Sequence, residues 1–259
     1  MDIELIKAFF MGIVQGITEF FPISSTAHLI LMPKFFGWTG QLDSLSFDIA
    51  LHAGTLASLL VCFCKDWIEI FKNNRKLLLY LAIGTIPAGI AGVFFKDTIE
   101  TALRHPGYIA AALVAGSIIM IAAEKYGSSH QKKQNAGMFD ALFIGIAQAI
   151  ALIPGISRSG ITISAGLFRN IDRASAARFS FLLSTPAIAG AALLEARHMI
   201  STQSRLDLDM VAVGFGAAFI SGLLAIKFLM SFLKKHPLNI FIYYRLALAA
   251  AILLAYLLM

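Results

Sequence analysis

Six stretches of the chain are apolar over the length that a membrane-spanning helix needs. An α-helix rises about 1.5 Å per residue, so about 20 apolar residues cross the hydrocarbon core of a bilayer. The six windows cover residues 45–64, 77–95, 107–124, 174–194, 210–232 and 239–258. Because a helix in a soluble protein rarely needs such a window, the pattern predicts six transmembrane helices.

Two further apolar stretches are interrupted by proline and then by a run of Ser, Thr and Gly. Residues 4–37 break at Pro22, and residues 139–168 break at Pro154. Backbone groups freed from a helix at membrane depth are tolerated only where they are buried in protein or line a watery cavity. We therefore expect each stretch to form a re-entrant helical hairpin around a pocket.

The two breaks resemble each other at an offset of 133 residues. The offset superposes Gly12, Ile13, Gln15, Ile17, Ile23, Ser24 and Thr26 on Gly145, Ile146, Gln148, Ile150, Ile156, Ser157 and Ser159. Each hairpin is followed by three spans, an odd number, so the second copy enters the membrane from the opposite side. We predict an all-α polytopic membrane protein, in which a single membrane domain, residues 1–259, contains inverted repeat halves at about 1–124 and 139–259. The two breaks should meet at the site.

Composition and charge agree with a membrane protein and exclude one that binds nucleic acid. Apolar residues make up 58% of the 259 residues and charged residues 14%, unlike ordinary soluble domains. The formal net charge of +6 forms no basic stripe with interleaved aromatic residues. The basic residues gather in loops on one side of the predicted membrane: Lys65, Lys72, Arg75, Lys76, Lys125, Lys132, Lys133, Arg169, Arg173, Arg178, Lys234 and Lys235. By the positive-inside rule this side is cytoplasmic, and both termini face outward.

The first broken segment carries a carboxylate, a hydroxyl and an imidazole close together. Gln15 and Glu19 are spaced i,i+4 and share a helix face, while Ser25 and His28, at i,i+3 after the break, can also meet. These residue types can supply a nucleophile, a base and a metal ligand. The alternative is that Glu19 pairs with a buried arginine and that residues 24–26 cap the next helix. We favour catalysis, because ionisable groups within a membrane are costly and usually functional.

The second broken segment has the features of an anion cradle. Its glycines allow close approach to the backbone, and the new helix presents free N–H groups at its N-terminus. Arg158 adds a planar set of donors that matches phosphate oxygens. The alternative is that Arg158 only pairs with Glu19, which would still place both residues in one pocket. Hydroxyl groups come from Ser157, Ser159 and Thr162.

Other polar residues in the apolar windows have weaker claims. His52 is interpreted as a hydrogen-bonded packing residue, although it could face the pocket. Lys227 and Arg245 lie near span ends and can extend to the interface. Tyr243 and Tyr244 are typical of interfacial anchors.

At the two broken segments the sequence resembles the bacterial undecaprenyl-diphosphate phosphatase family, the bacitracin-resistance type. The resemblance runs along the whole chain, and its most specific parts are QGITEFFPISSTAH at residues 15–28 and PGISRSGIT at residues 154–162. It implies hydrolysis of undecaprenyl diphosphate to the monophosphate, which renews the lipid carrier for cell-wall glycans in the bacterial inner membrane. It also implies a divalent cation, Mg²⁺ or Ca²⁺, with Glu19 as its ligand.

The resemblance also implies roles for individual residues. Glu19 matches the essential glutamate of the family, whereas Gln15 stands where many members have Glu, and Ala27 replaces a common glycine. The expected catalytic residues are Glu19, Ser25, His28 and Arg158. The expected phosphate-binding residues are Gln15, Ser24, Thr26, Gly155, Ser157, Ser159, Gly160 and Thr162.

We hypothesise that Arg158 and the backbone of residues 157–160 hold the terminal phosphate while Glu19 helps to hold a cation on the diphosphate. Either Ser25, deprotonated by His28, or His28 itself would attack phosphorus.

The pocket should open outward, to the periplasmic side. The protein could also form a homodimer. A different class, a secondary transporter or flippase for an anionic lipid, also uses inverted repeats with broken helices.

Overall fold

The part of the chain that the structure, a computed structural model, describes is helical. It comprises residues 3–95, 98–99, 101–127, 133–202 and 207–258. Within these ranges α-helices are joined by short connections that include two 3₁₀ turns, Gly40–Asp43 and Ala102–Arg104. The predicted all-α class is confirmed.

Within the described ranges six helices are long and apolar enough to cross a membrane, which agrees with the six predicted spans. They are α3 (Leu45–Cys62), α5 (Arg75–Phe94), α7 (Pro106–Tyr126), α10 (Arg173–Thr202), α11 (Leu208–Phe232) and α12 (Asn239–Leu258). Their bounds lie within a few residues of the predicted windows, except that α10 continues beyond its apolar stretch, which ends at Leu194.

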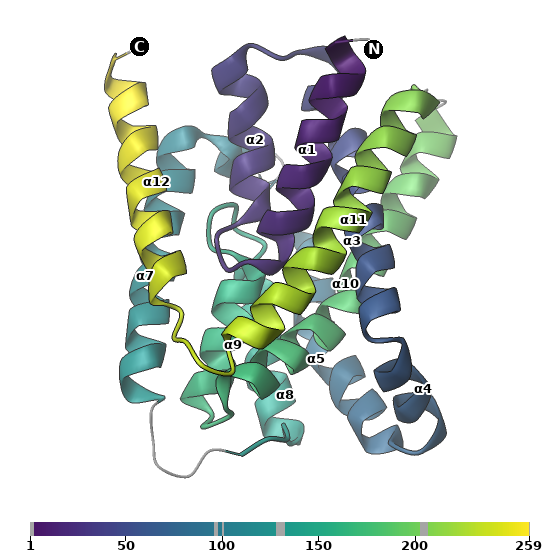
Figure 1. Ribbon diagram of the computed structural model, residues 1–259, viewed down its shortest axis with the longest axis vertical. Helices are drawn as coiled ribbons and strands as arrows, with labels where there is room; N and C mark the ends of the chain where they lie inside the picture. The colour runs from purple at the N-terminus through teal and green to yellow at the C-terminus, as the bar shows by residue number, and fades with distance from the viewer. Residues whose placement is uncertain (1–2, 96–97, 100, 128–132, 203–206, 259) are drawn as a thin grey trace.

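The two interrupted stretches form helical hairpins. They consist of α1 (Ile3–Phe20) with α2 (Ser25–Phe36), and of α8 (Met138–Ile150) with α9 (Arg158–Phe168). Pro22 and Pro154 lie in the turns, where no helical N–H is needed. The two turns meet between the ends of the long helices (Figure 1), and Ser159 of one donates a hydrogen bond to Phe21 of the other. The depth of the hairpins in a bilayer stays a prediction.

Each turn ends in a serine with unusual backbone geometry. Ser24 and Ser157 have φ angles of 74° and 71°, a region that residues other than glycine rarely adopt. Each serine caps the next helix: Ser24 Oγ accepts the N–H of Ala27 at 3.4 Å, and Ser157 Oγ accepts that of Gly160 at 3.3 Å. Backbone strain of this kind clusters at functional sites and persists only where the surroundings hold it. The same local geometry recurs at both turns.

Three helices of the first half begin 133 residues before their counterparts in the second half. The starts of α2, α5 and α7 pair in this way with those of α9, α11 and α12: Ser25 with Arg158, Arg75 with Leu208, and Pro106 with Asn239. The first hairpin packs α1 against α11, and the second packs α8 against α5. An inverted repeat produces these exchanged partners, because α8 corresponds to α1 and α11 to α5. The single domain with two repeat halves stays a prediction that these observations support.

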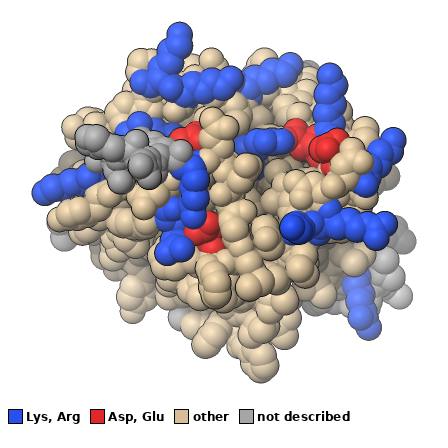
Figure 2. Space-filling view, turned by 90° about the horizontal axis from the view of Figure 1, so that it is seen from below, with Lys and Arg blue, Asp and Glu red and all other residues tan. Residues whose placement is uncertain are grey.

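One end of the molecule is rich in basic side chains. Seen from below, many Lys and Arg side chains are spread over this face and its rim, with fewer Asp and Glu among them (Figure 2). This end carries α4 (Cys64–Lys72), a short helix that the apolar windows did not predict, and both chain termini lie at the opposite end (Figure 1). The positive-inside rule uses this kind of asymmetry.

Ion pairs fasten the second hairpin at the basic end. Asp140 in α8 accepts hydrogen bonds from Lys133 Nζ at 2.5 Å, from the Gly137 N–H at 2.8 Å and from Arg169 Nε at 2.7 Å. Burial alone would raise the pKa of Asp140, but these donors outweigh burial and hold the pKa below its usual range. The charged carboxylate therefore ties the start of α8 to the end of α9.

Candidate active site

Glu19, near the end of α1, lies where the two hairpin turns meet. Its side chain is only 6% exposed. One carboxylate oxygen, Oε1, accepts a hydrogen bond from Arg158 Nη2 at 2.5 Å. The other, Oε2, accepts hydrogen bonds from Ser25 Oγ at 2.6 Å and from Gln15 Nε2 at 3.1 Å. Four residues predicted from two distant motifs are therefore in direct contact.

His52, in α3, also reaches this carboxylate. Its Nε2 lies 3.4 Å from Glu19 Oε2, and its Nδ1 lies 2.8 Å from the backbone oxygen of Asp48. A carbonyl oxygen only accepts, so Nδ1 carries a hydrogen, and Nε2 can donate to Glu19 only when the ring is protonated. His52 therefore both packs within α3 and faces the site.

His28 does not meet Ser25 as its spacing suggested. Its Nδ1 lies 2.7 Å from the backbone oxygen of Ser24, and its Nε2 lies 2.7 Å from the hydroxyl of Tyr244. The imidazole and the Tyr244 ring are stacked, with centroids 5.8 Å apart. The side chain that accepts the hydrogen bond of the Ser25 hydroxyl is Glu19. Sequence spacing could not show this, because Tyr244 comes from α12, more than 200 residues later.

Arg158, the first residue of α9, combines one occupied and one free donor group. Its Nη2 binds Glu19, whereas its Nη1 is buried with no hydrogen-bond partner. Leaving a buried donor unpaired costs about 1–3 kcal/mol, so the group calls for an explanation such as a ligand. The N-terminus of α9 adds backbone N–H groups that the helix itself cannot satisfy. Both features suit a phosphate oxygen.

The hydroxyl groups of the second hairpin divide between the turn and the helix packing. Ser159 Oγ donates to the backbone oxygen of Phe21 at 3.2 Å and lies 3.3 Å from Ser157 Oγ, so both serines stay at the turn. Thr162 is fully buried, donates to the backbone oxygen of Arg158 at 2.7 Å and lies 2.6 Å from Ser180 Oγ in α10. These contacts make Thr162 a link between α9 and α10, one helical turn from the site.

The remaining predicted residues shape the turns. Gly155 has a φ angle of 103°, and a Cβ there would lie 2.6 Å from a backbone oxygen of α7, so only glycine fits. A Cβ at Gly160 would lie 3.4 Å from Pro22 in the first hairpin. Ser24 is buried and Thr26 is exposed.

The oxygens around Glu19 suit a cation that also contacts phosphate. In the described ranges no three His, Cys, Asp or Glu side chains gather closely enough to hold a metal ion. Glu19 supplies one carboxylate, and Gln15 Oε1 is a buried oxygen with no hydrogen-bond partner. Mg²⁺ is commonly held by one or two carboxylates together with the phosphate oxygens of a substrate. These residues therefore fit a cation that shares its ligands with a diphosphate.

Arg245, in α12, lies behind both turns. Its side chain is fully buried, Nη2 donates to the backbone oxygen of Gly155 at 2.9 Å, and Nη1 lies 3.4 Å from that of Pro22. The expectation that Arg245 extends to the membrane interface is wrong, because these carbonyls and a hydroxyl of α7 hold it inside. The sequence does contain a feature that points to a buried role, a lone arginine within an apolar span. Placing such a charge in a membrane is costly unless the residue has a function.

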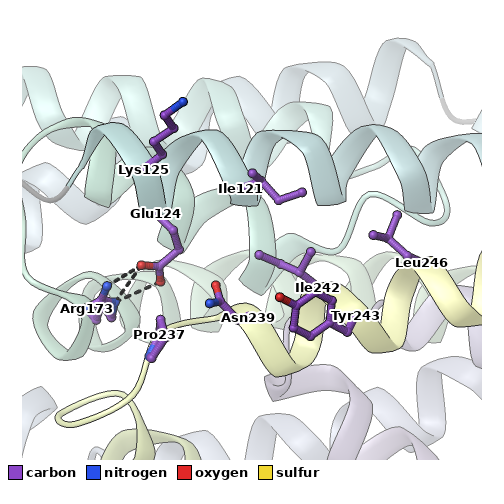
Figure 3. Close-up of a pocket in the computed structure, with 9 residues that line it drawn as sticks. All are labelled: Ile121, Glu124, Lys125, Arg173, Pro237, Asn239, Ile242, Tyr243 and Leu246. Carbon is purple, nitrogen blue, oxygen red and sulfur yellow. Dashed lines mark hydrogen bonds and ion pairs between the residues drawn. The ribbon is translucent and has the colours of Figure 1, made fainter.

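A cavity of about 510 Å³ lies between α7, α10 and α12, away from the two hairpin turns. Figure 3 shows its lining, in which the carboxylate of Glu124 binds the guanidinium of Arg173 beside Pro237. The backbone N–H of Leu238 also donates to Glu124, at 2.9 Å. None of the residues predicted for catalysis or phosphate binding lines this cavity, which is therefore separate from the site at the turns.

Comparisons with known proteins agree along the whole chain. Residues 8–251 match the family described as bacitracin resistance protein BacA. A protein of Thermodesulfovibrio yellowstonii is 59% identical over 98% of both chains, and one of Elusimicrobium minutum is 45% identical over 96% of this chain and 97% of its own. A third, from Desulforudis audaxviator, is 42% identical over 94% of both chains. All three relatives carry the name undecaprenyl-diphosphatase.

Proposed function

The chain belongs to the bacitracin resistance protein BacA family, and we propose that it is a membrane phosphatase that hydrolyses undecaprenyl diphosphate to undecaprenyl phosphate and inorganic phosphate. This reaction recycles the lipid carrier of cell-wall synthesis in the bacterial inner membrane. The name that the relatives share supports the substrate. The observation that carries the chemistry is the convergence of a carboxylate, a hydroxyl and a guanidinium where the two hairpins meet.

The second hairpin would bind the terminal phosphate. The Nη1 group of Arg158 is a buried donor with no partner, and Nη2 can remain on Glu19 while Nη1 takes a phosphate oxygen. The α2 and α9 helices both begin at the turns, so two helix N-termini with partial positive charge face the same region. This environment stabilises the charge that develops during transfer.

Ser25 is the nucleophile that the geometry favours. As its Oγ attacks the terminal phosphorus, its proton passes to Glu19 Oε2, and the bond between phosphorus and the bridging oxygen breaks. The proton then passes to the departing undecaprenyl phosphate. In the second step water attacks the phosphoserine, Glu19 takes a proton from the water, and that proton returns to Ser25 as inorganic phosphate leaves. Both ring nitrogens of His28 face other groups, which disfavours it as the attacking residue.

A divalent cation, Mg²⁺ or Ca²⁺, belongs to the proposal. Glu19 and Gln15 would hold it, and when bound it would neutralise charge on the diphosphate. Because these residues provide few ligands without substrate, Mg²⁺ alone should leave the melting temperature of the purified protein unchanged, and chelation by EDTA should stop phosphate release. A clear stabilisation by Mg²⁺ without substrate would contradict the shared-ligand arrangement.

The site is proposed to open to the outer side of the membrane. The first hairpin has its open end on the side of the chain termini, opposite the basic face (Figure 1). All the residues named in the reaction come from one chain, so a homodimer is not required for the chemistry.

The experiment that tests the function is phosphate release from undecaprenyl diphosphate by the purified protein in detergent. The wild-type protein should release inorganic phosphate, and Arg158→Ala should reduce release by about 10²-fold or more, as for other lost charge-stabilising donors. A folded wild-type protein that releases no phosphate from this lipid would refute the proposal and favour transport of an anionic lipid.

A further inference from the structure

The proposed reaction gives no task to the buried guanidinium of Arg245. We propose that Arg245 is a positioning residue that ties the two hairpin turns together and so sets the placement of Ser25 relative to Arg158. The effect of Arg245 on catalysis rests on the proposed phosphatase function. Its role in joining the two turns is argued from its hydrogen bonds alone.

The guanidinium contacts equivalent points of the two hairpins. Nη2 donates to the backbone oxygen of Gly155 at 2.9 Å, and Nη1 donates to that of Pro22 at 3.4 Å. Pro22 and Gly155 are 133 residues apart, the offset of the repeat, and each stands three residues before the reactive residue of its hairpin, Ser25 or Arg158. A displacement of either carbonyl would therefore move the nucleophile or the phosphate-binding group.

Helix α7 holds the other side of the guanidinium. Nε donates to Ser117 Oγ at 3.1 Å, and Nη2 donates to the backbone oxygen of Leu113 at 3.1 Å. A Cβ at Gly116 would lie 2.2 Å from Nη2, so a glycine in α7 provides the space that Arg245 occupies. Helices α7 and α12 thus form a frame, and Arg245 fastens both turns to it.

The charge of Arg245 has no carboxylate partner in the described part of the chain. Its hydrogen-bond partners are three backbone oxygens and one hydroxyl, and its side chain is fully buried. A charge in this position is costly and is retained where it has a function. Only arginine offers a planar set of donors that reaches several acceptors at once, because lysine presents a single compact ammonium group.

The first measurement is steady-state phosphate release by Arg245→Lys and Arg245→Met, with Lys227→Met as the matched control. Lys227 is an exposed cation in another span, α11. A displacement of about 1 Å at a reacting group costs on the order of 10²-fold in rate, so kcat of Arg245→Met should fall by about 10²-fold, with KM within about threefold. Arg245→Lys should recover part of this loss, and Lys227→Met should match the wild type.

The second measurement follows the two turns without using activity. Cysteines replace Pro22 and Gly160, because a Cβ at Gly160 would lie 3.4 Å from the Cβ of Pro22, close to the Cβ separation of a disulfide, and the free cysteines Cys62 and Cys64 are replaced by serine. Disulfide formation should be fast in the protein with Arg245. With Arg245→Lys or Arg245→Met it should slow by about tenfold or more, which corresponds to about 1.4 kcal/mol of activation free energy.

The outcomes separate the possibilities. The proposal would be overturned if Arg245→Lys had the same kcat and the same cross-linking rate as the wild-type protein. It would also be overturned if the kcat of the variants fell while their cross-linking rate stayed unchanged. If Arg245→Met does not fold, Arg245→Lys, which keeps the charge, decides. If the wild-type protein releases no phosphate, the proposed function fails, but the cross-linking rates still decide whether Arg245 ties the turns.

Discussion

Ser25 and His28 are three residues apart, yet their side chains face different neighbours. The Ser25 hydroxyl donates to the carboxylate of Glu19, which is also bound by Arg158. The His28 ring lies between the backbone oxygen of Ser24 and the hydroxyl of Tyr244. A nucleophile needs a base within hydrogen-bond reach, and only Ser25 has one at the site.

This difference predicts unequal effects of two alanine variants. Ser25→Ala should lower phosphate release by about 10³-fold or more, as loss of a nucleophile does in other hydrolases. His28→Ala should lower it by about tenfold, because it removes hydrogen bonds of about 1 kcal/mol each that brace the turn. Acid quenching during turnover should trap a phosphoserine, which survives acid. An acid-labile phosphoenzyme, typical of phosphohistidine, would show that His28 attacks instead.

At the scale of elements, each hairpin is seated by a close helix contact through glycine. A Cβ at Gly12 in α1 would lie 2.3 Å from the backbone oxygen of Gly214 in α11. A Cβ at Gly145 in α8 would lie 2.3 Å from the backbone oxygen of Gly84 in α5. Small residues let membrane helices approach closely enough for backbone contact. The two hairpins are therefore held in equivalent ways.

These contacts predict which glycine substitutions are harmful. Gly12→Ala and Gly145→Ala should each destabilise the protein by about 1–3 kcal/mol, the usual range for overpacking, because a backbone oxygen cannot move aside. Gly89→Ala in α5 and Gly216→Ala in α11 are the matched controls, since nothing lies within 4 Å of a Cβ at either position. Melting temperatures in detergent should fall for the first pair only. Equal falls in both pairs would mean that helix packing is not the cause.

At the scale of the whole molecule, the charge asymmetry predicts the orientation in the membrane. The basic face lies opposite the chain termini, so it should be cytoplasmic, and the first hairpin should open outward. The exposed residues Thr26 and Lys72 are suitable probes of the two sides.

Single cysteines at these positions, in a chain with Cys62 and Cys64 replaced by serine, test this orientation. A membrane-impermeant maleimide added to intact spheroplasts should label Thr26→Cys without permeabilisation. It should label Lys72→Cys only after permeabilisation. The reverse pattern would place the site on the cytoplasmic side.

The sequence alone was sufficient for the spans, the two hairpins and the chemical types at the site. Long apolar windows determine the spans because burial of backbone polar groups in lipid leaves few alternatives to a helix. Proline and small polar residues mark the turns for a related reason, since they interrupt helical hydrogen bonding. The convergence of Glu19 and Arg158 also followed, because the repeat places the two breaks together.

Only the tertiary structure decided which atoms face one another. Spacing along a helix limits which side chains can meet, but the ring of His28 is held by Tyr244, and Glu19 is reached by His52, each from another helix. The prediction that the side chain of Arg245 extends to the membrane interface is wrong for the same reason. In an apolar span a lone charge can extend to the interface or be buried against backbone oxygens, and the carbonyls of Pro22 and Gly155 that bury it are brought together only by the packing of both hairpins.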